Sequence, residues 1–143
     1  KAIQHDSSKG FFYPYLAELY LRFKLDKEAS SVCDEGSRVV QPDEKNIPAL
    51  YNMQILLASA ALMRGDKAAQ LAAVEKAEKF AGEKHPEFAF AIGSTYATMD
   101  PPQKEKAVRL LNQFTQRVCR GAKGKNFQEQ CETASSLLQK LGS

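Results

Sequence analysis

The chain repeats a short helical pattern, and this repeat constrains the fold more than any other feature. Alanines recur 39 residues apart, at Ala29, Ala68 and Ala107, each near the start of a segment rich in helix-forming residues. A related pattern precedes each alanine, as Leu16-Ala17-x-x-Tyr20, Leu57-Ala58-x-x-Ala61 and Ile92-Gly93-x-x-Tyr96. Repeats of this length that hold two helical segments are typical of helical solenoids. We therefore expect an all-α chain built from helix pairs.

Capping and turn residues divide the chain into seven expected helices. Asp26 and Asp66 are expected N-caps, while Pro42 and the pair Pro101-Pro102 end helices. The expected helices cover residues 8–24, 26–41, 47–64, 66–81, 86–99, 103–120 and 126–141. Short loops make neighbouring helices antiparallel. The prediction is one domain, 1–143, with helix pairs over 8–42, 47–82 and 86–121 and a capping helix over 126–141.

These residues resemble the tetratricopeptide repeat family, in a degenerate form. The family pairs two helices per repeat, with small residues where helix backbones approach closely. The residues that carry the resemblance are Leu16, Ala17, Tyr20, Ala29, Cys33, Gly36 and Pro42; Leu57, Ala58, Gly65, Ala68, Ala72 and Ala77; and Ile92, Gly93, Tyr96, Ala107, Leu111 and Phe114. The alanine spacing of 39 exceeds the family's usual period of about 34. A second register, with Leu50-Tyr51-Asn52-Met53 as the core of the second repeat, stays open.

The resemblance implies a concave groove, lined by the first helix of each pair, that binds a peptide or protein segment. The expected groove residues are Phe11, Tyr15, Arg22, Asn52, Ile55, Ser59, Met63, Phe90, Ser94 and Thr98, with Glu18, Leu56 and Glu87 on the same stripes. The stripes lack the basic residues of the family's carboxylate clamp, so a segment with apolar anchors is expected. The alternative that Phe11, Tyr15, Ile55 and Phe90 simply complete the core stays open.

Two of the three cysteines bracket one loop. Cys119 and Cys131 flank residues 121–125, between two helices that are expected to be antiparallel. Such a connection can bring the Cα atoms within the roughly 4.4–6.8 Å of a disulfide. A bridge would indicate an extracytoplasmic location, most simply a bacterial periplasm. Two free thiols in a cytoplasmic protein are the alternative, and Cys33 is expected in the core.

The sequence offers no residues for catalysis, a cofactor or a metal. His5 and His85 lack partners at metal-ligand spacing, and residues 121–125 lack the strand and the Ser or Thr of a phosphate-binding loop. No run approaches the ~20 apolar residues of a membrane-spanning helix. The sequence therefore predicts a non-enzymatic scaffold for protein–protein interaction, without membrane insertion.

Two other functions remain as alternatives. Residues 1–24 could continue a longer repeat array or mediate self-association. A helical-repeat RNA reader is the third class, but the net charge of +3 is too small to favour a nucleic-acid partner. The basic residues Arg117, Arg120, Lys123 and Lys125 fit a helix C-terminus and a solvated loop better than a phosphate site.

Overall fold

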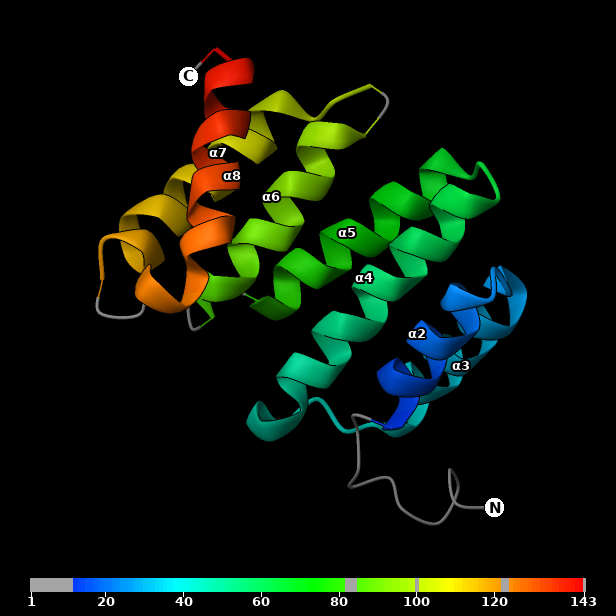
Figure 1. The fold of residues 1–143 in the computed structure, drawn as a ribbon. Helices are drawn as coiled ribbons and strands as arrows, with labels where there is room; N and C mark the ends of the chain where they lie inside the picture. Colours follow the sequence, from blue (N-terminus) through cyan, green and yellow to red (C-terminus); the bar gives the residue numbers. More distant parts are fainter. Residues whose placement is uncertain (1–11, 82–84, 100, 122–123, 143) are drawn as a thin grey trace. The chain divides into compact units, whose positions relative to one another are not determined.

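The computed structural model describes residues 12–81, 85–99, 101–121 and 124–142 (Figure 1). These residues form helices and turns and include no strand, which confirms the expected all-α class for this part of the chain. The chain divides into two compact units, unit 1 over Lys1–Phe80 and unit 2 over Ala81–Ser143. None of the described helices is both long and apolar enough to cross a membrane.

Unit 1 contains the helices α2 (Phe12–Arg22), α3 (Asp26–Val39), α4 (Ile47–Met63) and α5 (Lys67–Ala81). A 3₁₀ turn over Glu44–Asn46 leads into α4. Helices α2, α3 and α4 pack on one another around a shared apolar core. The buried members of this core are Tyr13, Ala17, Ala29, Cys33, Val40, Leu50 and Met53. Half-buried Phe80, at the end of α5, also packs against it.

A glycine of α3 lies against side chains of both α2 and α4. A Cβ atom on Gly36 of α3 would overlap Sδ of Met53 on α4 and would lie 2.7 Å from Cγ of Tyr13 on α2. Both side chains are fully buried and have little room to move. The small residue is therefore required by packing, as the sequence pattern predicts for such positions.

Unit 2 contains α6 (Ala89–Thr98), α7 (Lys104–Phe114) and α8 (Gln128–Lys140). A 3₁₀ turn over Pro86–Phe88 precedes α6, a π-helical turn over Thr115–Cys119 extends α7, and a 3₁₀ turn over Gly124–Phe127 precedes α8. Gly93 of α6 lets α7 approach, since a Cβ there would lie 2.9 Å from Cγ of Leu111. The buried ring of Phe114 contacts Phe90 and Phe127, with centroids 5.3 and 6.2 Å away.

Each upstream pattern ends at a residue whose carbonyl accepts a hydrogen bond across the following turn. The carbonyl oxygens of Tyr20, Ala61 and Tyr96 accept the backbone N–H groups of Leu25, Asp66 and Gln103. The first two bonds join residues five apart, whereas the third joins residues seven apart, so only the first two turns are alike. The small residues of the three patterns, Ala17, Ala58 and Gly93, are all buried.

The alanine pattern is wrong in the second pair. The N–H groups of Ala29, Gln70 and Ala107 bond to the carbonyls of Leu25, Asp66 and Gln103, so Gln70 occupies the place expected for Ala68. Gln70 is buried, whereas Ala68 is exposed, as is Ala72. The expectation that Ala68 sits at a close helix contact is therefore overturned.

Of the expected helix starts, one is confirmed and two differ from the structure. Asp66 precedes α5 and its Oδ1 accepts the N–H of Ala69 at 3.0 Å, which confirms it as a cap. Asp26 instead is the first residue of α3, and Leu25 precedes the helix without a side-chain cap. Pro86 begins a 3₁₀ turn rather than α6 itself. The expected start of the first helix, at residue 8, lies outside the described residues.

The turns after α2 and α4 share one backbone conformation. Gly65 has a φ of +74°, and Lys24, at the equivalent place, has a φ of +58°. Glycine adopts this left-handed region without cost, whereas a side chain makes it unfavourable. The first turn therefore holds a strained lysine where the second holds a glycine.

Candidate binding groove

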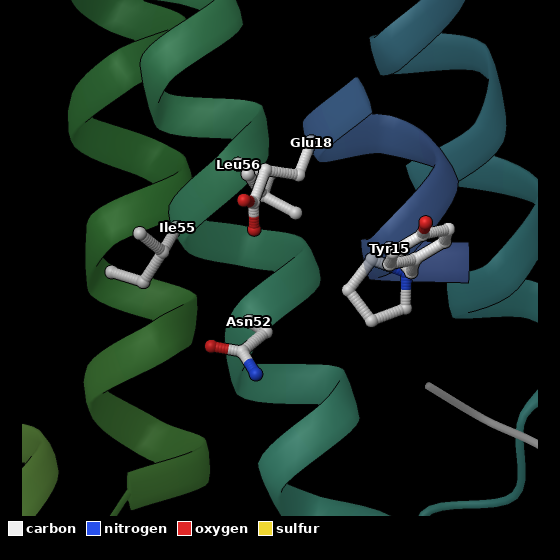
Figure 2. A pocket seen from close by; sticks show the side chains of 6 residues that line it. Tyr15, Glu18, Asn52, Ile55 and Leu56 are labelled. Atoms are coloured by element: carbon white, nitrogen blue, oxygen red, sulfur yellow. The ribbon is translucent and has the colours of Figure 1, made fainter. Parts of the chain in front are cut away.

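A groove between α2 and α4 gathers several residues that the sequence places on one surface (Figure 2). Its volume is about 440 Å³, and it is open to solvent. The lining residues are Pro14, Tyr15 and Glu18 of α2 and Asn52, Ile55 and Leu56 of α4. We call this the α2–α4 groove. It lies wholly within unit 1.

The helical repeat explains why these residues face the groove. Tyr13 and Ala17 of α2 are buried in the core. Leu50 and Met53 of α4 are buried in the same core. The lining residues lie on the flanks beside these core stripes, because residues three or four apart share a helix face. Leu56 also packs against the core, so the apolar floor of the groove is continuous with the interior of unit 1.

Aromatic and polar groups combine at the groove. Tyr15 is 71% exposed, the largest exposed fraction among the large hydrophobic residues that the structure describes. Glu18 accepts a hydrogen bond from Nη2 of Arg22 at 2.9 Å. Figure 2 shows the Glu18 carboxylate extending toward α4, and the Asn52 side chain carrying its amide at the other end of the lining. The site presents apolar contact area together with hydrogen-bonding groups.

Other expected groove residues in unit 1 do not line this groove. The Ser59 hydroxyl donates to the carbonyl of Ile55 at 3.3 Å, within α4. Met63 is half exposed at the end of α4, and Arg22 is held by Glu18. Phe11 lies outside the described residues. The structure thus brings together Tyr15, Asn52 and Ile55 from the expected set.

The expected residues of unit 2 lie on α6. Phe90 is half-buried and packs on Phe114, so its ring belongs to the aromatic core of unit 2. The Ser94 hydroxyl is buried and has no hydrogen-bond partner among the described residues. Thr98 is exposed, and its hydroxyl donates to the Ser94 carbonyl at 2.9 Å. A packing role for Phe90 was the open alternative, and this contact favours it.

The cysteine pair is placed as the sequence predicts. Cys119 and Cys131 have their sulfurs at disulfide-bonding distance and their Cα atoms 5.8 Å apart. Cys119 ends the π-helical turn after α7, and Cys131 lies in the first turn of α8. Cys33 is buried in unit 1, and this burial, together with Asp34, raises its pKa to about 12. It is therefore a protonated, unreactive thiol at neutral pH.

No group of three or more His, Cys, Asp or Glu side chains in the described part of the chain could hold a metal ion. His85 stacks on Phe88 at 4.9 Å, and its Nδ1 lies 3.5 Å from Oε1 of Glu87. Arg117, Arg120 and Lys125 are exposed, as expected, whereas Lys123 is not described.

No family model, curated protein or solved structure matches this chain. The tetratricopeptide resemblance therefore rests on the residues of the sequence that carry it.

Proposed function

We propose that the chain is a non-enzymatic interaction module whose α2–α4 groove binds a segment of a protein partner. The observation that supports this most is the exposed Tyr15 ring beside an apolar floor of Ile55 and Leu56. Tyrosine supplies a large contact area at low entropic cost and is enriched among residues that dominate binding energy. A half-enclosed apolar surface of this kind gains free energy when a partner side chain covers it.

The polar groups of the groove suit a peptide backbone. An asparagine side chain offers one carbonyl acceptor and two N–H donors, which match the N–H and C=O of a peptide unit. Asn52 lies in the lining beside Ile55, so a bound segment can place an apolar side chain on Ile55 and its backbone on Asn52. An extended segment or a helix with apolar anchors fits this arrangement.

The proposal includes a tetratricopeptide-like arrangement of the helix pairs and an extracytoplasmic location. The turns after α2 and α4 support the first, because their hydrogen bonds span the same number of residues. The cysteine pair supports the second, because disulfides persist in oxidising compartments.

Selection from a displayed library of random linear peptides tests the binding function. Peptides selected on the wild-type protein are then titrated against Ile55→Ala and Leu62→Ala, two large-to-small changes on the same helix. Leu62 is 63% exposed and lies outside the groove lining, so it controls for general loss of apolar surface. We expect Ile55→Ala and Tyr15→Ala to weaken binding roughly tenfold or more, and Leu62→Ala to leave it unchanged.

Two results would overturn the proposal. One is a library that yields no peptide above background on the folded protein. The other is a set of selected peptides whose affinity responds equally to Ile55→Ala and Leu62→Ala, because binding would then lie elsewhere on the chain.

A further inference from the structure

The charged side chain in the lining of the α2–α4 groove is that of Glu18. The other lining residues are uncharged: Pro14, Tyr15, Asn52, Ile55 and Leu56. Helix α4, which forms the opposite wall, contains no Lys, Arg, Asp or Glu between Ile47 and Met63. The described lining therefore presents one carboxylate to a bound segment, although the chain as a whole carries a net charge of +3.

Part of this carboxylate is available to a partner. Oε1 of Glu18 accepts a hydrogen bond from Nη2 of Arg22 at 2.9 Å, one helical turn further along α2. Oε2 has no hydrogen-bond or ion-pair partner among the described residues, and a carboxylate can accept about four hydrogen bonds. The two side chains are 58% and 70% exposed, and an ion pair in water contributes little free energy. A partner's cation can therefore bind this carboxylate beside Arg22 or in its place.

The exposed ring of Tyr15 adds a second attraction for a cation. Tyr15 and Glu18 are neighbours on the surface of α2, because residues three apart share a helix face. The ring is 71% exposed, and the face of a tyrosine attracts an ammonium or guanidinium group within about 6 Å. Figure 2 shows the Glu18 side chain extending toward α4, where Leu56 belongs to the apolar floor. A lysine or arginine can thus lay its apolar stem on this floor and bring its charged head to the ring and the carboxylate.

We propose that the α2–α4 groove selects a protein segment in which a lysine or arginine stands close to an apolar anchor, and that Glu18 determines this selection. The inference rests on the proposed peptide binding and names the chemistry of the bound segment. The apolar anchor contacts Ile55, whereas the cation pairs with Glu18. An uncharged segment lacks the second contact, and an acidic one is repelled by the carboxylate. Glu18 is thus a specificity-determining residue, while the apolar floor supplies most of the affinity.

The composition of peptides selected from a displayed random library provides the first test. Peptides selected on the wild type should be enriched in lysine and arginine, whereas the net charge of +3 alone would favour acidic peptides. Glu18→Lys should replace this enrichment with aspartate and glutamate. Glu28→Lys is the matched control, because Glu28 is an exposed carboxylate of α3 outside the groove lining and the change in charge is the same. It should leave the lysine and arginine enrichment in place.

Two results of this selection would overturn the proposal. One is the same peptide composition on the wild type and on Glu18→Lys. The other is enrichment of acidic peptides on the wild type, which would assign the charge contact to Arg22 instead.

Titration of one selected peptide and of its lysine-to-glutamine derivative provides the second test. The change in the peptide should weaken binding to the wild type about fivefold at low ionic strength, as expected for an exposed ion pair. The same change should have no effect on binding to Glu18→Gln, whereas Glu28→Gln should behave as the wild type does. Equal losses on the wild type and on Glu18→Gln overturn the pairing. Circular dichroism of each variant confirms that it is folded.

The failure of this inference is distinct from the failure of peptide binding itself. If no peptide binds, or if Ile55→Ala leaves binding unchanged, the groove is not a binding site and both proposals fall. If the selected peptides depend on Ile55 but not on Glu18, peptide binding stands and only the selection of a cation falls.

Discussion

Both units bring helices together at a glycine, Gly36 in unit 1 and Gly93 in unit 2, but unit 2 adds a phenylalanine cluster and a cysteine pair. Unit 1 keeps its cysteine buried and unpaired at position 33. Unit 2 places Phe90, Phe114 and Phe127 in contact and holds Cys119 beside Cys131.

The difference follows from the amount of apolar surface that each unit can bury. Unit 2 is the smaller of the two, and the fraction of surface buried on folding falls with size. Short helices also gain little from local propensity alone. The aromatic rings and the cysteine pair at disulfide distance are expected to compensate for this in unit 2. The comparison predicts that the two units respond to different perturbations.

The largest expected effect is loss of the cysteine link. The bridge closes a loop of 12 residues, and removing such a link costs roughly 3 kcal/mol. We expect Cys131→Ser to expose amides of α8 first in hydrogen exchange while α2 and α3 stay protected. Three titratable thiols in denatured, unreduced native protein would contradict the link and the extracytoplasmic location with it.

The second largest effect is expected from substitutions at the glycines where helices approach closely. Gly36→Ala forces a Cβ against side chains of two other helices, which costs about 1–3 kcal/mol and is partly offset by the better helix propensity of alanine. Gly93→Ala meets mainly Leu111. Urea titration should show a loss of stability for Gly36→Ala that exceeds the loss for Gly93→Ala. Equal losses would mean that unit 1 depends no more on a glycine contact than unit 2.

Alkaline pH should destabilise unit 1 in particular. Burial raises the pKa of Cys33 from 9.0 to about 12, so the unfolded chain releases a proton that the folded chain retains. Stability is therefore complete below pH 9 and falls by about 1.4 kcal/mol between pH 9 and pH 10. Burial and the charge of Glu35 also raise the pKa of Tyr13, which adds to the loss at the upper end.

Denaturant midpoints at pH 8 and pH 10 measure this effect. Cys33→Ala should flatten the dependence over that range without removing the contribution of Tyr13 at higher pH. An unchanged slope in Cys33→Ala would contradict the assignment to the thiol.

The smallest expected effect is in the turns of unit 1. Lys24→Gly should raise stability by about 0.5–1 kcal/mol because it relieves a left-handed φ of +58°. Gly65→Ala, with no atom within 4 Å of the added Cβ, should lower stability by a similar amount through backbone strain alone. Thermal midpoints of both variants check this, and a Lys24→Gly protein less stable than wild type would rule out strain at Lys24.

The all-α class, the positions of the helices along the chain and the cysteine pair could be predicted because they depend on local signals. Asp66 caps α5, prolines separate the elements, and the cysteines bracket one turn. The register of α5 could not be predicted in the same way. The similar Asp-Lys sequences at residues 26 and 66 suggested equivalent starts, but α3 begins at Asp26 and α5 begins after Asp66. This offset moves Ala68 to the surface.

The groove was only partly predictable from the sequence. Helical spacing places Tyr15, Asn52 and Ile55 on suitable flanks, since these positions depend on local periodicity. Whether Phe90 faces solvent or a neighbouring ring depends on α7, and no periodicity within α6 carries that information. The π-helical turn that ends at Cys119, near α8, likewise has no signature in the sequence.

The buried thiol of Cys33 can report the local unfolding of unit 1. With Cys119 and Cys131 joined, it is the one thiol that an alkylating reagent can reach, and only after α2, α3 and α4 separate. The labelling rate in native buffer then measures the opening equilibrium of unit 1, while unit 2, without a free thiol, is not labelled. Mass spectrometry during labelling therefore follows the opening of unit 1 alone, without any engineered probe.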